Sequence, residues 1–198
     1  MAISSSIRSH FEHSRDVLAD CVTSEKLLIA CDAIAGVMAQ ALRAGGKILF
    51  IGNGGSAGDA QHLAGEFVSR LNFDRAPLAA IALTADTSVM TAVGNDYGYE
   101  QIFVRQVHAL GRKGDVLVGI STSGRSPNIL AALKAARELK ITTVGFGGQS
   151  STPMASLCDY ILVAPATSSP LIQQVYMVAG HAICGQVELD LFGMPGGL

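Results

Sequence analysis

The sequence predicts an α/β fold in which a doubly wound, parallel sheet of five strands is covered by helices on both faces. Five short apolar runs alternate with longer runs of helical periodicity, which is the pattern of strands joined by crossover helices. The apolar runs are continuous, as expected for strands that are buried on both faces. The expected strands are residues 47–52, 78–83, 115–120, 141–146 and 160–164.

Two helices are expected before the first strand. Apolar residues recur at helical spacing through residues 5–44, and Thr23 and Ser24 interrupt the pattern as candidate caps. Gly45 and Gly46 are typical of the end of the second helix. The helices that alternate with the strands are expected at residues 57–71, 87–93, 98–111, 127–139 and 171–192.

The 198 residues are interpreted as a single domain, because no repeat, charge block or linker of low complexity divides them. Residues 1–45 form its N-terminal helices, residues 46–192 its α/β core and residues 193–198 a frayed tail.

Composition limits the partners that we expect. Only 15% of the residues are charged and 49% are hydrophobic, so other subunits are expected to cover part of the apolar surface. The net charge of -2 gives no reason to expect nucleic acid or an anionic membrane. We find no secretory signal, no membrane span of roughly 20 apolar residues and no C-x-x-C pair among the four cysteines. Reduced thiols and a cytoplasmic location are therefore expected.

The first candidate ligand loop, residues 52–58, lies between the first strand and a helix. Gly54 and Gly55 suit a tight turn, whereas Asn53 and Ser56 are able to contact a ligand. A helix N-terminus offers unpaired N–H groups and partial positive charge, so the loop suits an anion.

Three other interpretations of this loop are less well supported by its residues. A plain tight turn does not explain the polar residues among the glycines. Gly52, Gly54 and Ala57 match the dinucleotide fingerprint, but Asp74 precedes the next strand and Asp86 lies too far beyond it to hold a ribose. A nucleotide P-loop is excluded because no Gly-Lys-Ser/Thr follows.

The second candidate ligand loop, residues 121–126, follows the third strand and precedes Pro127, which suits a first helical position. An ordinary serine cap needs one hydroxyl group, whereas this loop has four, which suit a phosphate monoester. These hydroxyl groups belong to Ser121, Thr122, Ser123 and Ser126. Arg125 either reinforces an anion or points to solvent. Two such loops at strand ends predict a crevice for a phosphorylated small molecule.

Four further residues suit a metal ion or acid–base chemistry. His62 and Glu66 are one turn apart on an expected helix, and Gln173 and His181 lie about two turns apart on the last one. Two imidazoles with a carboxylate suit Zn²⁺. A surface His–Glu pair and a buried structural His181 are the alternatives, and the residues alone leave them open.

With these motifs in place, the chain resembles the sugar isomerase (SIS) domain family over nearly its whole length, and within that family the bacterial phosphoheptose isomerases. The motifs are specific together, whereas each alone is weak. They are residues 52–56, 59–62 with Glu66, 94–96, 114–117, 119–124, and 172–173 with His181.

The resemblance implies a flavodoxin-like fold and a homotetramer with active sites at subunit interfaces, in which the N-terminal helices of residues 1–45 are used for oligomerisation. It implies one zinc ion per site, held by His62, Glu66, Gln173 and His181. It implies that the sugar phosphate is held by Ser56, Ser121, Thr122, Ser123 and Ser126. Other residues implied in substrate binding or site order are Asn53, Gly54, Gly55, Arg70, Asp96 and Gln173.

The implied reaction is the isomerisation of sedoheptulose 7-phosphate to D-glycero-D-manno-heptose 7-phosphate through an enediol, as the first step toward ADP-heptose for lipopolysaccharide or capsule. Glu66 is the expected base and His181 the expected acid partner. Two other functions stay open, namely a non-catalytic tetramer that binds a replication initiator and a sensor of sugar phosphates. The presence of Glu66 and His181 together favours the enzyme.

Overall fold

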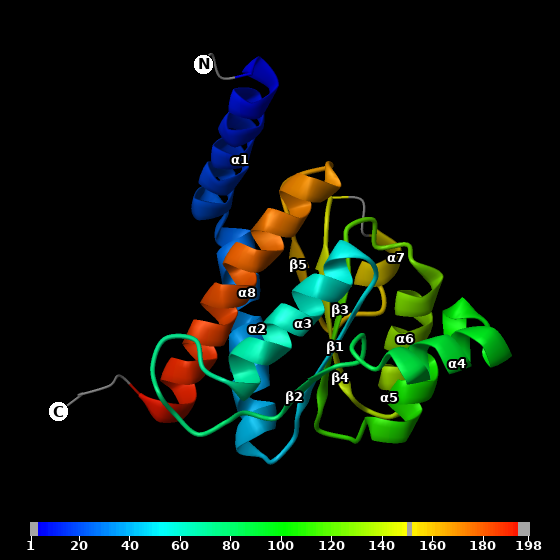
Figure 1. Ribbon diagram of the computed structural model, residues 1–198. Coiled ribbons are helices and arrows are strands. Elements are labelled where there is room, and N and C mark those ends of the chain that lie inside the picture. The colour runs from blue at the N-terminus through cyan, green and yellow to red at the C-terminus, as the bar shows by residue number, and fades with distance from the viewer. Residues whose placement is uncertain (1–3, 150–151, 194–198) are drawn as a thin grey trace.

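The sheet of this computed structural model, which describes residues 4–149 and 152–193, has five parallel strands in the order β2-β1-β3-β4-β5 (Figure 1). This order is the flavodoxin-like arrangement, so the predicted fold class is confirmed. The strands are β1 (Ile48–Gly52), β2 (Ala80–Ala82), β3 (Val116–Ser121), β4 (Thr142–Gly147) and β5 (Tyr160–Val163).

Helices cover both faces of the sheet and enclose two hydrophobic cores (Figure 1). One core contains Phe50 of β1 with apolar residues of α2, α3 and α8, and the other contains Leu49 of β1 with residues of α5 and α6. The helices are α1 (Ser5–Thr23), α2 (Glu25–Arg43), α3 (Gly55–Val68), α4 (Thr87–Tyr97), η1 (Tyr99–Gln101), α5 (Val104–Leu110), α6 (Pro127–Glu138), α7 (Thr152–Ala155) and α8 (Ser169–Phe192).

The two N-terminal helices are confirmed with their predicted boundary. Ser24 caps α2 by accepting a hydrogen bond from the N–H of Leu27, and Gly45 follows α2 with a positive φ of 81°. The N-terminal part of α1 extends beyond the core and exposes Ile7 and Phe11 (Figure 1). This end of α1 therefore carries exposed apolar side chains.

Several predicted element boundaries were wrong. The strand expected at 78–83 is shorter, because Leu78 donates its N–H to the carbonyl of Phe67 at the end of α3. The helix expected at 98–111 is divided into η1 and α5, and α4 continues to Tyr97 before Gly98 ends it with a φ of 86°. The short helix α7 was not predicted, and of the expected tail only Gly193 is described.

None of the helices in the described residues is long and apolar enough to cross a membrane. All four cysteines are free thiols. Cys184 is buried on α8, where burial raises its pKa to about 12. It is therefore a protonated core thiol rather than a nucleophile.

Candidate active site

The two predicted ligand loops follow β1 and β3, which are neighbours in the sheet. The chain continues from β1 toward one edge of the sheet and from β3 toward the other, so the loops lie at the topological switch point where ligands of such folds bind. In the first loop Gly54 has φ 57° and ψ −121°, a conformation that only glycine adopts readily. A Cβ atom at Gly55 would meet the side-chain amide of Gln173, so the first loop and the start of α8 lie close together here.

The first loop is joined to α6 by a pair of side-chain amides. Asn53 donates from Nδ2 to Oδ1 of Asn128 over 2.9 Å, and Asn128 donates from Nδ2 to Oδ1 of Asn53 over 2.8 Å. The hydroxyl of Tyr99 donates to the same Asn53 oxygen over 3.0 Å. Asn53 is thereby held in one orientation beside the loop glycines.

The hydroxyl groups of the second loop contact one another and α8 rather than capping α6. Ser126 occupies the N-cap position of α6 without a side-chain cap bond, and its Oγ lies 3.2 Å from Oγ of Ser121. The Oγ of exposed Ser123 accepts from the N–H of Arg125 over 3.3 Å. Oγ1 of Thr122 lies 3.2 Å from Oγ of Ser169 at the start of α8. A simple capping role therefore does not explain these hydroxyl groups.

The candidate metal ligands from α3 and α8 meet. Nε2 of His62 lies 2.8 Å from Nε2 of His181 and 3.2 Å from Oε1 of Glu66. One ligand atom from each of the three residues lies within 4.8 Å of the others. The side chain of His62 is 48% exposed and that of Glu66 20%, so the cluster is open on one side.

Close contact between α3 and α8 makes this meeting possible (Figure 1). Gly180 immediately precedes His181, and Leu63 immediately follows His62. A Cβ atom at Gly180 would lie 2.6 Å from Cδ2 of Leu63, so a larger residue there would push the helices apart.

The side-chain amide of Gln173, on α8, lies beside Gly55 of the first loop. Burial raises the pKa of Asp59, whereas the Gln173 amide and the His62 imidazole lower it in part. Oδ2 of Asp59 and the hydroxyl of Tyr176 are buried without a hydrogen-bond partner among the described residues. The contact between α3 and α8 therefore contains two buried polar atoms that no described residue satisfies.

Two predicted site residues are exposed and form no polar contact with the other candidate site residues within the described part of the chain. Arg70 is exposed just beyond α3, and Asp96 is exposed on α4, where its Oδ1 accepts from Asn95. Neither forms a hydrogen bond or ion pair with another candidate site residue in the described ranges 4–149 and 152–193.

Sequence reasoning missed three residues that hold the loops, namely Tyr99, Asn128 and Ser169. Ser169 had a usable signal, because Ser168 and Ser169 precede Pro170 as Ser126 precedes Pro127. Asn128 had none, since an asparagine in the first turn of a helix is common.

Comparison with known proteins decides the family. A profile of the SIS domain matches residues 9–148. The chain belongs to the SIS domain family. The predicted family is thereby confirmed.

Individual members of the SIS family cover nearly the whole chain. A relative named phosphoheptose isomerase from Burkholderia pseudomallei (strain 1710b) is 51% identical over 187 residues, which are 94% of this chain and 95% of the relative. One of the same name from Bradyrhizobium sp. (strain BTAi1) is 51% identical over 93% of each chain. The solved phosphoheptose isomerase of Francisella tularensis superposes with a TM-score of 0.89 at 36% identity, covering 94% of this chain and 98% of that structure.

Proposed function

We propose that this SIS protein is a phosphoheptose isomerase, an aldose–ketose isomerase that acts on sedoheptulose 7-phosphate. The observation that carries the proposal is the meeting of His62, Glu66 and His181 within 4.8 Å. These residues lie on α3, which begins in the first loop, and on α8, whose first turn contacts the hydroxyl loop through Ser169. Relatives that are about 50% identical and are named phosphoheptose isomerase support the same activity.

The reaction requires a proton to move between two neighbouring carbon atoms. We assign to Glu66 the removal of the proton from the carbon beside the carbonyl and its return to the neighbouring carbon. We assign to His181 the transfer of a proton between the two oxygens, so that the enediol forms and collapses without net oxidation. The open side of the cluster, at the 48% exposed His62, leaves space for the sugar.

The residues of the cluster fit a zinc ion. Two facing imidazole nitrogens and a carboxylate oxygen are ligands that Zn²⁺ prefers. We propose His62, Glu66, Gln173 and His181 as the ligands, and Asp59 as a support for His62 and Gln173. When bound, the ion would polarise the carbonyl and hydroxyl oxygens of the sugar.

We assign phosphate binding to the second loop. Ser121, Thr122, Ser123 and Ser126 offer hydroxyl groups where α6 begins, and the positive end of that helix favours an anion. Ser56, at the start of α3, and the backbone of Gly54 and Gly55 belong to the same crevice. Asn53, held by Asn128, is oriented toward sugar hydroxyls in this proposal.

We propose that the working protein is a homotetramer with sites completed between subunits. Exposed Ile7 and Phe11 on α1 are an apolar face that requires a cover. Arg70 and Asp96 are exposed and, among the described residues, make no polar contact with the site of their own chain, which is consistent with a contribution to the site of a neighbouring subunit. We further propose that the enzyme works in the cytoplasm and supplies heptose phosphate for ADP-heptose of lipopolysaccharide or capsule.

The non-catalytic alternatives do not account for the catalytic pair. A protein that only binds a sugar phosphate or a replication initiator needs the hydroxyl loop but no carboxylate beside two imidazoles. The 3.2 Å approach of Glu66 to His62 and the 2.8 Å approach of His62 to His181 therefore favour the enzyme.

The test uses NMR to monitor proton exchange in D₂O, with sedoheptulose 7-phosphate as the substrate. We expect an aldose product carrying deuterium at the carbon beside the carbonyl, and loss of this product after chelation. Glu66→Gln should abolish turnover, by at least about 10³-fold, while leaving the oligomer and phosphate binding intact. A zinc-loaded tetramer that exchanges no proton would reject the substrate, and an active Glu66→Gln variant would reject the base.

A further inference from the structure

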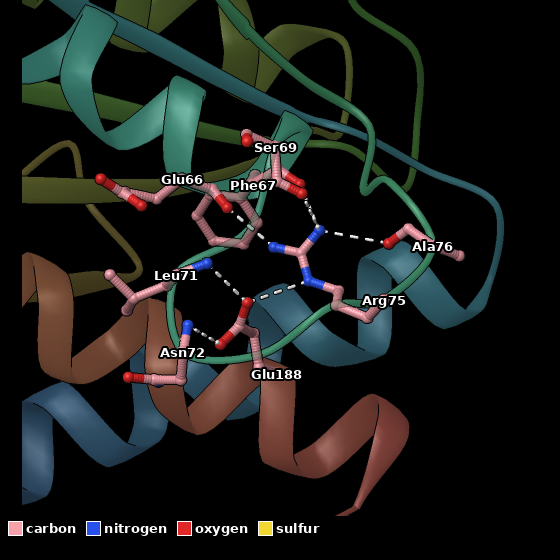
Figure 2. Close-up of polar contacts among 8 residues, drawn as sticks. All are labelled: Glu66, Phe67, Ser69, Leu71, Asn72, Arg75, Ala76 and Glu188. Carbon is pink, nitrogen blue, oxygen red and sulfur yellow. Dashed lines mark hydrogen bonds and ion pairs between the residues drawn. The ribbon is translucent and has the colours of Figure 1, made fainter. Parts of the chain in front are cut away.

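A buried ion pair joins Arg75, in the segment that follows α3, to Glu188 on α8 (Figure 2). Nε of Arg75 lies 3.0 Å from Oε1 of Glu188, and the two side chains are 2% and 1% exposed. The carboxylate of Glu188 also accepts from the N–H groups of Leu71 and Asn72, over 2.9 and 3.0 Å. A buried ion pair is by itself weak evidence for stability, because removing two charges from water offsets much of their attraction.

The other nitrogen atoms of Arg75 bind the end of the helix that carries Glu66. Nη2 donates to the carbonyl oxygen of Glu66 over 2.7 Å, and Nη1 donates to that of Phe67 over 2.7 Å and that of Ser69 over 3.1 Å (Figure 2). The last carbonyls of a helix have no partner within the helix, and a cation there is favoured by the helix dipole. Arg75 therefore fixes the final turn of α3 at the residue that we assign as the base.

Glu188 has a defined relation to the acid partner on α8. It lies seven residues, or about two turns, beyond His181, so both side chains project from one face of α8 toward α3. Contact between Gly180 and Leu63 fixes the two helices near the histidines. The Arg75–Glu188 pair fixes α3 and α8 relative to each other on the other side of Glu66.

We propose that Arg75 and Glu188 are positioning residues, which hold Glu66 at the correct place relative to His62 and His181. The inference rests on the site roles assigned above to Glu66 and His181. The pair contacts the backbone of Glu66 and not the reacting atoms, so it acts through that residue. An error of about 1 Å in the placement of a catalytic group is enough to lower the rate about a hundredfold.

A second buried carboxylate of the chain provides a matched control. Asp115 accepts from the N–H groups of Lys47 and Arg112 over 3.0 and 2.8 Å, and from Nζ of Lys47 over 2.6 Å. It therefore has two backbone donors and one cation, as Glu188 has. Lys47 and Asp115 directly precede β1 and β3, so they lie at the N-terminal ends of these strands, whereas the ligand loops lie at the C-terminal ends. Loss of this carboxylate should lower stability without moving Glu66.

The experiment compares Glu188→Gln with Asp115→Asn, below the thermal transitions of both. We expect both variants to lower Tm. Only Glu188→Gln should lower kcat, by about tenfold or more with KM within about twofold, because substrate binding does not depend on the pair. Only Glu188→Gln should weaken zinc binding, by about tenfold, in a titration of the metal-free protein without substrate.

Arg75→Lys provides a second variant, which matters if Glu188→Gln does not fold. Lysine keeps a positive charge beside Glu188 but lacks the planar fork that reaches several carbonyl oxygens at once. We expect a lower kcat with an unchanged KM, although the charge pair is retained. A wild-type kcat and wild-type zinc affinity in Arg75→Lys would overturn the proposal, as would equal kcat losses in Glu188→Gln and Asp115→Asn.

The zinc titration separates this inference from the proposed function. If the wild-type protein does not isomerise sedoheptulose 7-phosphate, the proposed reaction is rejected. Weaker zinc binding in Glu188→Gln, but not in Asp115→Asn, would still support the role of the Arg75–Glu188 pair in positioning Glu66. If Glu66→Gln loses turnover but keeps its zinc, while Glu188→Gln retains both its rate and its zinc affinity, the base assignment stands and the positioning role is rejected.

Discussion

Nε2 of His62 lies 2.8 Å from Nε2 of His181, although 119 positions separate the two residues in the sequence. The rings are 5.0 Å apart between centroids and inclined by 65°, so the two nitrogen atoms face each other rather than the rings stacking. A metal ion needs an unprotonated nitrogen from each imidazole, and this arrangement presents both toward one point. Oε1 of Glu66 lies at the same point, 3.2 Å from Nε2 of His62.

The first prediction concerns the metal content. His62→Ala removes one of the two facing nitrogen atoms, so the purified variant should lose nearly all of its zinc, compared with about one ion per wild-type chain. His108→Ala is the control, because His108 is exposed on α5 and is not part of the cluster. Elemental analysis of the two variants measures the difference, and equal zinc in both would contradict the proposed site.

The second prediction concerns the phosphate loop. Ser123→Ala removes one exposed hydroxyl group far from the reacting carbons, so it should raise KM about tenfold and change kcat by less than about twofold. Ser156→Ala is the matched control, since Ser156 is exposed and, among the described residues, donates to the carbonyl of Pro153 alone. Steady-state kinetics test both variants, and a KM of Ser123→Ala that equals that of the control would remove Ser123 from the cradle.

The parts of this fold that could be predicted are those with a local sequence signal. Continuous apolar runs such as 115–120 predicted the strands, and the glycines and hydroxyl groups that follow them predicted the loops. The i, i+4 spacing of His62 and Glu66 placed both side chains on one helical face, and the structure confirms their 3.2 Å approach. These features depend on residues close in sequence, where backbone periodicity determines which side chains meet.

The features that were missed depend on contacts over long distances in the sequence. Arg75 and Glu188 are 113 positions apart, and neither has a neighbour that marks it as buried. Asn53 and Asn128 are 75 positions apart, and only the pairing of β1 with β3 brings them together. Periodicity describes one helix at a time, so it could not predict that Gly180 allows α8 to approach α3.

The third prediction tests the Asn53–Asn128 pair. Asn128→Ala leaves the Asn53 amide and the N–H of Ile129 without the oxygen that they share, at a cost of about 2 kcal/mol. Tm should fall by about 4–8 °C, and KM should rise because Asn53 is no longer held in orientation. Asn95→Ala, on the exposed face of α4, should leave Tm unchanged in the same calorimetric measurement. Equal Tm values for the two variants would show that the amide pair does not hold the first loop.

The last prediction follows from the ionisation of Glu188. Burial alone would raise the pKa of its carboxyl group, but the N–H groups of Leu71 and Asn72 and the Arg75 guanidinium together lower it below the ordinary value of 4.5. A carboxyl group with a lowered pKa in the folded state contributes stability that is present above the ordinary value. That contribution is lost as the pH falls through the folded value.

Glu188→Gln cannot titrate at this position, so comparison with the wild type isolates the contribution. The Tm of the wild type should exceed that of the variant by a constant amount from about pH 8 to about pH 6. The difference should shrink as the pH is lowered below about 4.5 and through the lowered pKa of Glu188, because the wild-type carboxylate becomes protonated and ceases to pair with Arg75. The difference in Tm is measured by thermal unfolding across this pH range, monitored by circular dichroism. A difference that stays constant or widens in acid would mean that the charge of Glu188 does not stabilise the contact between α3 and α8.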